Sequence, residues 1–292
     1  MSIQEIIIRT LIVLIVAPIL GCIMSGVDRR VSAHLQSRVG PPLLQPWYDF
    51  RKLMSKENVV VNKFQNLYIV FYFAFILLSL FMLVFEMDLL MIIFVYTIAN
   101  VALILASMST GSPYSRIGAS REVVAMLAYE PVLIFFVVGM YMLTGSFNIA
   151  SLNNTPGPLL TKLPLIFVAM LFIMIIKFKK SPFDLSASHH AHQELVKGMF
   201  TDFSGPTMAA IEFSHWYEYV FLSGIMFLFW KQNIVIGTLL SLFTFFFVIV
   251  VDNISARLSW KWLIKFTWTV VIGLSVINIL FIYFYNLKLL KI

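Results

Sequence analysis

The chain contains a single cysteine, Cys22, among 292 residues. One thiol cannot form a disulfide within the chain, and it cannot hold an iron–sulfur cluster, which needs about four ligands. Charge is scarce as well: only 12% of residues are charged, against about 25% in an ordinary soluble domain. These absences exclude a disulfide-stabilised scaffold. We therefore expect any redox centre that works with this chain to belong to a partner.

Apolar residues are in excess: they make up 60% of the chain, and its mean hydropathy is +0.92. A soluble fold of this size could not bury so much apolar surface, so the solvent must be lipid. The length allows about eight spanning helices of about 20 residues each. The composition thus predicts an all-α integral membrane protein with a single transmembrane domain over residues 1–292.

Eight continuous apolar runs predict the positions of these helices. They cover Ile6–Met24, Leu67–Phe85, Leu89–Ser107, Val123–Leu143, Leu159–Ile176, Met208–Trp230, Ile234–Val251 and Phe266–Tyr285. Lys162 and Pro164 interrupt the fifth run, which we retain because a lysine near a helix end can extend to the interface. The eighth run has no acidic or basic residue, so we expect it to form a lipid-facing wall.

Basic residues are concentrated in alternate connections between these runs. The connections after the first, third, fifth and seventh helices contain most of the 21 lysines and arginines. The positive-inside rule then places these four connections in the cytoplasm and both termini outside the cell membrane. Cleavage of a signal near Cys22 would put the most basic connection outside, so we favour an uncleaved first helix.

The first basic connection contains an amphipathic segment. Leu43, Trp47, Phe50 and Met54 recur at helical spacing on one face. This pattern predicts a helix that lies along the membrane interface. The helix either rests on the membrane surface only or also docks a cytoplasmic partner. In the second case the docking residues are Arg38, Gln45, Asp49 and Lys52.

Two glutamates mark the start of the fourth predicted helix. Glu122 and Glu130 are eight residues apart, which places them about 12 Å apart along the axis and within about 80° of each other. A bare charge inside a membrane helix costs at least about 2.5 kcal/mol, and Pro131 frees the carbonyl of Leu127 nearby. An acid beside a free carbonyl suits a hydrated pocket. The alternative is a structural acid that is protonated or paired.

A polar segment, Lys180–Val196, separates the fifth and sixth apolar runs and contains Asp184 and Glu194. It also contains three histidines, His189, His190 and His192. Their spacing is poor for a zinc motif, and no cysteine lies near. Two interpretations remain open: the histidines form hydrogen bonds at a partner interface, or they relay protons near the cytoplasmic surface, since free imidazole titrates near pH 6.5.

The sixth apolar run contains Glu212, His215 and Glu218 at intervals of three, so neighbouring pairs share a helix face. Two acids around an imidazole can share one proton; alternatively, the three groups only satisfy one another inside the bundle. Asp252 ends the seventh run. The predicted ion path comprises Glu122, Glu130, Asp184, Glu194, Glu212, His215, Glu218 and Asp252. We expect no catalytic, metal-binding or cofactor-binding residue in this chain.

Three motifs occur together in this order. The first is Arg38-Val-Gly-Pro41, followed by Leu43-Leu-Gln-Pro46 and a segment that ends at Lys56-Glu57; the second is Arg121 with Tyr129-Glu130; the third is Pro182-Phe-Asp-Leu185 with Gln193-Glu-Leu-Val196. Their combination resembles the membrane subunit that anchors the peripheral arm in respiratory complex I and in energy-converting NiFe hydrogenases.

Two departures from the complex I pattern resemble the hydrogenase branch, that of the group 4 enzymes. Pro42 runs directly into Leu43, and His189-His-Ala-His192 stands where complex I has Glu-Ala-Glu. This resemblance implies a complex that oxidises ferredoxin or formate, reduces protons to hydrogen and translocates protons or sodium ions. It implies four partners: a nickel-bearing large subunit, a small subunit with a 4Fe–4S cluster, a ferredoxin-like iron–sulfur subunit and an antiporter-like membrane subunit. All cofactors would lie in partners.

Three alternatives remain. The chain could be the quinone-binding membrane subunit of a complex I-type NADH:quinone oxidoreductase. It could be a passive anchor with no part in ion movement, or an independent transporter.

Overall fold

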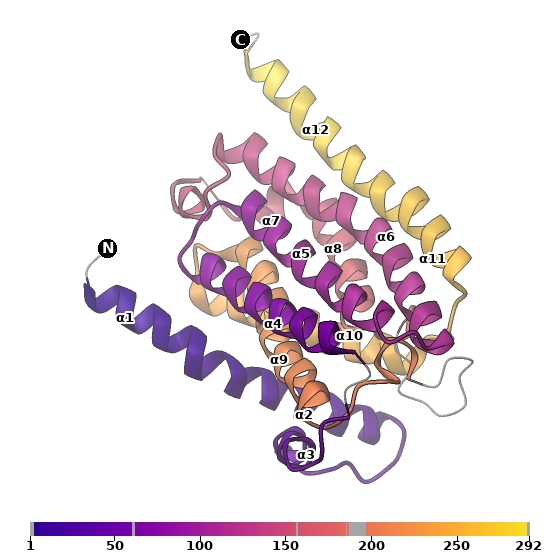
Figure 1. The fold of residues 1–292 in the computed structure, drawn as a ribbon. Helices are drawn as coiled ribbons and strands as arrows, with labels where there is room; N and C mark the ends of the chain where they lie inside the picture. The colour runs from indigo at the N-terminus through magenta and orange to yellow at the C-terminus, as the bar shows by residue number, and fades with distance from the viewer. Residues whose placement is uncertain (1–2, 60–61, 156, 185, 187–196, 291–292) are drawn as a thin grey trace.

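Long helices packed side by side build the described part of the chain (Figure 1). The computed structural model describes all residues except 1–2, 60–61, 156, 185, 187–196 and 291–292. Its α-helices are α1 (Ile3–Leu11), α2 (Ala17–Leu35), α3 (Gln45–Met54), α4 (Lys63–Val84), α5 (Leu89–Met108), α6 (Pro113–Thr144), α7 (Leu159–Lys162), α8 (Pro164–Lys177), α9 (Gly205–Phe227), α10 (Ile234–Ile254), α11 (Trp260–Phe266) and α12 (Ile272–Leu290).

Six helical segments of the described chain are long and apolar enough to cross a membrane. They are Ile3–Leu35, Lys63–Val84, Leu89–Met108, Pro113–Thr144, Ile234–Ile254 and Trp260–Tyr285. The first and last are continuous because π-helical turns at Ile12–Val16 and Thr267–Val271 join α1 to α2 and α11 to α12. The prediction of an all-helical, multi-pass membrane protein is confirmed. Residues of the other two predicted spans form α7 with α8 and α9.

The predicted boundaries were wrong where polar residues continue a helix. The first helix runs to Leu35 and the fourth begins at Pro113, so Asp28 and Glu122 lie inside helices rather than in loops. Pro131 lies inside α6, and the helix continues past it. The sequence pattern located the apolar core of each helix but not the polar turns that extend it.

The fifth predicted span is divided at Leu163 into α7, a single turn, and α8, which has 14 residues. Asn278 of α12 satisfies the backbone at this break. Its Oδ1 accepts hydrogen bonds from Leu165 N at 2.9 Å and Ile166 N at 3.1 Å, and its Nδ2 donates to Lys162 O at 3.1 Å. Because of this contact α12 packs against α8 rather than only against lipid.

One face of α12 is therefore buried, and the other face is exposed and apolar, which is compatible with the predicted position at the lipid-facing edge. Ser275 and Asn278 lie on the buried face, whereas Phe281 and Phe284 are exposed on the other side. In Figure 1, α12 runs along the edge of the bundle beside α6.

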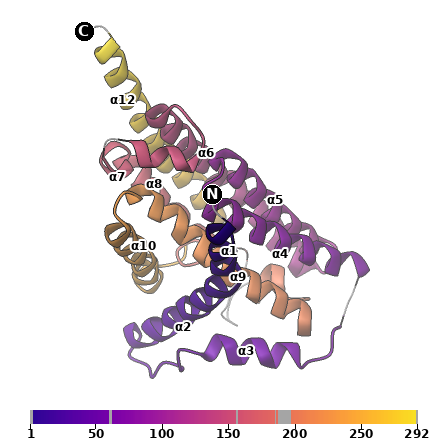
Figure 2. The same ribbon diagram turned by 90° about the vertical axis from the view of Figure 1, so that its left-hand side faces the viewer.

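Hydrogen bonds join the four basic connections at one end of the bundle, which we call the basic end. Gln36 contacts Asn253, Val59 contacts Ser204, Thr110 contacts Asp202, and Leu258 contacts Pro182. At the opposite end, Lys231 pairs with Glu86 at 3.0 Å. Figure 2 shows α3 lying across the basic end, beside α2 and α9.

α9 lies at the centre of the packing and contacts α2, α3, α4 and α10. A Cβ atom added at Gly21 of α2 would collide with the backbone carbonyl of Trp216, so the two helices meet backbone to backbone. On its other side α9 faces Tyr72 of α4 and Tyr96 of α5, both fully buried. These contacts position the polar side chains of α9 inside the bundle.

Candidate functional site

A polar cavity of about 560 Å³ opens at the basic end. α2, the segment after α8, α9 and the end of α10 surround it. Its ionisable lining residues are Asp28, Arg29, Arg38, Lys179, Lys180, Asp184, Glu212, His215, Tyr219, Asp252 and Arg257. Four of the residues predicted to form the ion path, Asp184, Glu212, His215 and Asp252, thus line one cavity.

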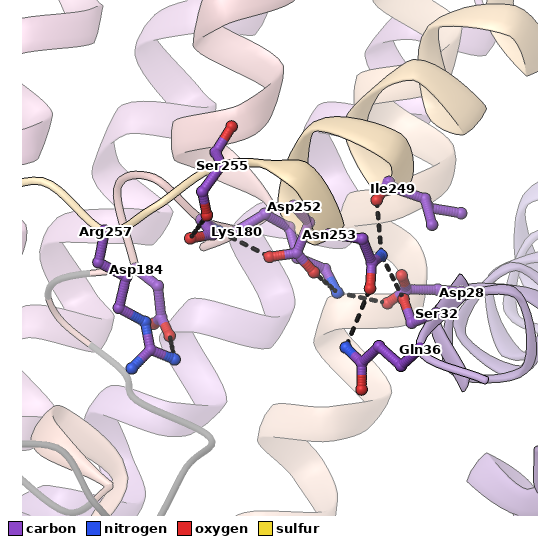
Figure 3. Close-up of polar contacts among 11 residues, drawn as sticks. Asp28, Ser32, Gln36, Lys180, Asp184, Ile249, Asp252, Asn253, Ser255 and Arg257 are labelled. Atoms are coloured by element: carbon purple, nitrogen blue, oxygen red, sulfur yellow. Dashed lines mark hydrogen bonds and ion pairs between the residues drawn. The ribbon is translucent and has the colours of Figure 1, made fainter. Parts of the chain in front are cut away.

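Lys180 lies between two carboxylates in this cavity (Figure 3). Its Nζ is 2.8 Å from Asp28 Oδ2 and 3.2 Å from Asp252 Oδ2. Burial acts to lower the pKa of Lys180, but the two carboxylates outweigh it and raise that pKa above its ordinary value. The ammonium therefore stays charged at neutral pH and ties α2 to α10.

The backbone around Lys180 is fixed to the same elements. Ser181 N donates to Asp252 Oδ1 at 2.8 Å, and Ser181 Oγ donates to Ser255 O at 3.2 Å. Leu258 N donates to Pro182 O at 2.9 Å. The start of the polar segment Lys180–Val196 is thus bound to the end of α10 and the residues after it.

Asp184 lies beside Arg257, with 3.6 Å between Asp184 Oδ2 and Arg257 NH2 (Figure 3). The Asp184 side chain is 7% exposed. Burial raises the pKa of Asp184 to about 6, although Arg257 opposes the shift. This carboxyl therefore changes its protonation state close to neutral pH.

Deeper in the bundle, α9 continues the series of ionisable groups. The His215 ring contacts the rings of Tyr72 and Phe200, with centroids 6.3 and 5.6 Å apart. One turn further, Glu218 is buried and accepts hydrogen bonds from Tyr96 at 2.5 Å and Tyr72 at 3.3 Å. These bonds of Glu218 reach tyrosines on α4 and α5, a pairing that the spacing on α9 did not predict.

Lys177, the last residue of α8, lies on the other side of Tyr96. It is only 5% exposed. Its Nζ donates to Tyr129 Oη at 2.7 Å and lies 4.2 Å from the centre of the Tyr96 ring. In the sequence, Lys177 stands among the basic residues of a predicted loop, so this buried position was not predicted.

The two predicted glutamates, Glu122 and Glu130, both lie inside α6. Glu122 is buried, and Glu130 Oε1 is buried without a hydrogen-bond partner among the residues that the structure describes. Tyr129 stands next to Glu130 and reaches Lys177. The ionisable groups of α6, α8 and α9 therefore lie around the same group of buried tyrosines.

The four predicted docking residues of the first basic connection lie at the basic end. Arg38 lines the polar cavity. Asp49 pairs with Arg29 at 2.5 Å and accepts a hydrogen bond from Gln45 at 2.9 Å. Lys52 lines a second cavity of about 270 Å³, between α3 and α9.

The apolar face of α3 was predicted only in part. Phe50 packs on Phe213 and Trp216 of α9, with centroids 5.5 and 5.6 Å apart. Leu43, Trp47 and Met54, by contrast, are 39%, 44% and 52% exposed. The helix therefore has one anchored side and one apolar side that is not covered.

His189, His190, His192 and Glu194 lie outside the described residues, so their predicted roles stay predictions. Among the residues that are described, no group of three histidine, cysteine or acidic side chains is arranged to hold a metal. Lys177, Tyr72, Tyr96 and Asp28 were not predicted as site residues. The one available signal was position: a lysine or aspartate that directly extends an apolar run can lie inside the bundle.

The fold and this site together define a multi-pass membrane protein in which a polar cavity leads to buried acids, tyrosines and a lysine. The family model described as NADH dehydrogenase matches residues 8–283. The chain therefore belongs to the NADH dehydrogenase family.

Its relatives include subunits of two kinds of complex. Formate hydrogenlyase subunit 4 of Escherichia coli (strain K12) is 30% identical over 221 residues, 70% of each chain. Hydrogenase-4 component C of the same organism is 28% identical over 218 residues, 69% of this chain and 66% of that protein, just under two thirds of its length. A subunit of the NADH-quinone oxidoreductase of Thermomicrobium roseum is 28% identical over 313 aligned residues, 88% of each chain.

A solved structure shares the fold. A chain of the membrane-bound sulfane sulfur reductase, an archaeal respiratory membrane complex, aligns with a TM-score of 0.84. The alignment covers 96% of this chain and 100% of that one, at 24% sequence identity.

Proposed function

We propose that this chain is the membrane anchor and ion-coupling subunit of an energy-converting NiFe hydrogenase complex. The main support is the series of ionisable side chains from the polar cavity through α9 to the buried tyrosines. Two relatives named as hydrogenase or formate hydrogenlyase subunits support the choice of complex. In this proposal the complex oxidises ferredoxin or formate, reduces protons to hydrogen and translocates protons or sodium ions.

The proposed partners are a nickel-bearing large subunit, a small subunit, a ferredoxin-like subunit and an antiporter-like membrane subunit. The NiFe centre and the 4Fe–4S clusters belong to these partners. Arg38, Gln45, Asp49, Lys52 and the three histidines of the polar segment form the docking surface. The chain itself performs no catalysis.

We propose eight crossings of the cell membrane: the six long apolar segments, α8 with α7, and α9. In this arrangement α3 lies at the interface, and its exposed apolar residues, Trp47 and Met54, contact lipid together with Leu43, which precedes the helix. The basic end faces the cytoplasm, because lysine and arginine are retained on that side, and both termini face outside.

In the proposed path, side chains of this chain bind and release protons. The cavity admits water at the basic end, where Asp184, Glu212, His215 and Asp252 line it. Glu218, Glu122 and Glu130 are the acids deeper inside. Moving one charge across 100 mV requires about 2.3 kcal/mol. A change in the protonation of a few such acids is large enough to be coupled to that work.

Glu130→Gln and Glu218→Gln in the intact complex test this proposal. Each substitution removes a protonatable group at constant size, so ion translocation per hydrogen evolved should fall in proteoliposomes while the complex still assembles. Glu86→Gln, at the opposite end of the bundle, is the matched control and should keep full coupling. If Glu130→Gln and Glu218→Gln both keep full coupling, the chain is a passive anchor and the coupling role is wrong.

One observation favours a second candidate, the quinone-binding subunit of a complex I-type oxidoreductase. An apolar cavity of about 390 Å³ lies between α2, α3 and α9, lined by Pro18, Ile19, Cys22, Ile23, Leu44, Trp47, Phe213 and Trp216. Organic extraction of the purified complex decides between the two. Stoichiometric quinone, with inhibition by quinone-site blockers, would select the second candidate.

A further inference from the structure

Lys177 is a buried cation for which the ion path above has no role. Its ammonium lies against two tyrosine rings, 3.9 Å from the centre of Tyr129 and 4.2 Å from the centre of Tyr96. Its hydrogen bond goes to Tyr129 Oη at 2.7 Å. The faces of aromatic rings attract cations, and most strongly in sites without water. Two such faces favour the charged form of Lys177.

Tyr96 connects this cation to an acid. The hydroxyl of Tyr96 donates to Glu218 Oε1 at 2.5 Å, while the face of the same ring lies against Lys177 Nζ. A phenol that donates to a carboxylate has a more electron-rich ring, and a cation over that ring makes the hydroxyl a better donor. The two contacts therefore strengthen each other, as polarised hydrogen-bond networks do.

Both charges are removed from water in this position, and the Tyr96 ring connects them. Lys177 is 5% exposed and Glu218 is 6% exposed. Removing one of two opposite buried charges leaves the other uncompensated, whereas replacing both is close to neutral. The charged and titratable groups that surround the pair are Tyr72 on α4, Tyr96 on α5, Glu122, Tyr129 and Glu130 on α6, Lys179 after α8, and Glu212, His215 and Tyr219 on α9.

We propose that Lys177 is a positioning residue for ion coupling: its ammonium, acting through Tyr96, keeps Glu218 ionised and so sets the pH range in which Glu218 exchanges its proton. This inference rests on the proposed role of Glu218 in the ion path. It assigns a function to a cation within a path otherwise composed of acids, histidine and tyrosines.

The first test measures ion translocation per hydrogen evolved against pH, with the intact complex in proteoliposomes. Lys177→Met removes the cation that favours the ionised carboxylate, so it should move the pH profile of coupling up by about one pH unit or more. Lys177→Arg keeps the charge and should keep the profile. Lys265→Met, an exposed lysine on α11 that does not line the cavity, is the control. A wild-type profile in Lys177→Met, or an equal shift in Lys177→Arg, would overturn the proposal.

The second test does not depend on coupling. Thermal stability of the complex is measured for Lys177→Met, Glu218→Gln and the double variant. Each single change should lower the melting temperature, and the double variant should recover at least half of the loss, because no unpaired charge remains. If Lys177→Met prevents purification, assembly yield in membranes serves the same comparison, and restoration by Glu218→Gln is the expected result.

The two tests separate this inference from the proposed function. Additive stability losses, or no restoration of assembly, would overturn the pairing of Lys177 with Glu218 whatever the complex does. Recovery in the double variant together with full ion coupling in Glu218→Gln would instead keep the pair and remove Glu218 from the ion path.

Discussion

At the scale of single residues, partners in the fold decide what each ionisable side chain does. Lys177 and Lys180 are three residues apart, yet one contacts tyrosines in the bundle and the other contacts two aspartates in the cavity. Glu218 accepts its hydrogen bonds from α4 and α5 rather than from its neighbours on α9. The sequence indicated the acids of α6 and α9 but not Asp28, and the partners come from helices far away in the chain.

Asp184 gives a prediction for pH dependence. Its carboxyl should titrate with a midpoint near pH 6. Infrared difference spectra of the carboxylic C=O band measure this titration, and Asp184→Asn should remove the band. Arg257→Gln should raise the midpoint, because the guanidinium favours the ionised form, whereas Lys261→Gln should leave it unchanged. A midpoint at the ordinary value of 3.8 would contradict the effect of burial.

The raised pKa of Asp184 also makes the free energy of unfolding depend on pH. Because the folded state binds this proton more tightly than the unfolded state, the contribution of Asp184 to the free energy of unfolding falls as pH rises from 3.8 to about 6. Above that range the carboxyl is ionised in both states, and its contribution no longer changes. Unfolding of the wild type and of Asp184→Asn in detergent, at a series of pH values, measures the contribution of Asp184.

At the scale of elements, apolar runs predicted the interior of the helices and missed their polar ends. The type of each element was predictable because lipid requires continuous apolar helices with paired backbones. The extension of α2 past Asp28 was not, since Asp28 is accepted inside the bundle only through its pairing with Lys180. The break at Leu163 was visible from Pro164, but its repair by Asn278 depends on a helix more than 100 residues later.

The contact between α2 and α9 gives a prediction at this scale. Gly21→Ala should separate the two helices, because the new Cβ would collide with the carbonyl of Trp216. We expect a loss of about 2 kcal/mol or more, in the range of overpacked cores, and a weaker contact between α3 and α9. Denaturation in detergent measures the loss.

Gly273→Ala is the matched control. Nothing lies within 4 Å of a Cβ at Gly273 of α12, so alanine should keep or improve stability by about 0.5–1 kcal/mol through its higher helix propensity. Equal losses in both variants would show that the α2–α9 contact is not close.

At the scale of the whole molecule, charge and polarity separate the two ends of the bundle. Alternating basic connections predicted this separation, and their mutual hydrogen bonds place them at one end. The cavity at that end was not predictable, because its walls come from α2, α9 and α10 together. Family motifs indicated where the acids lie but not the tyrosines and the lysine between them.

The orientation in the membrane is testable in whole cells because the chain has one cysteine. In a Cys22→Ser background, Asn153→Cys should react with a membrane-impermeant maleimide from outside. Ser55→Cys, on the basic end, should react only after the cells are permeabilised. Cys22→Ser without a new cysteine is the unlabelled control, and the reverse pattern would invert the proposed topology.

The Asn278 contact has a consequence for how the chain is made. The first turn of α8 exposes backbone N–H groups that are satisfied by a side chain synthesised 112 or 113 residues later. In hydrocarbon an unsatisfied backbone group costs several kcal/mol. In the proposed arrangement of eight crossings, α8 therefore gains its final contacts only after α12 has been synthesised, and a chain truncated before α12 would leave these N–H groups without Asn278.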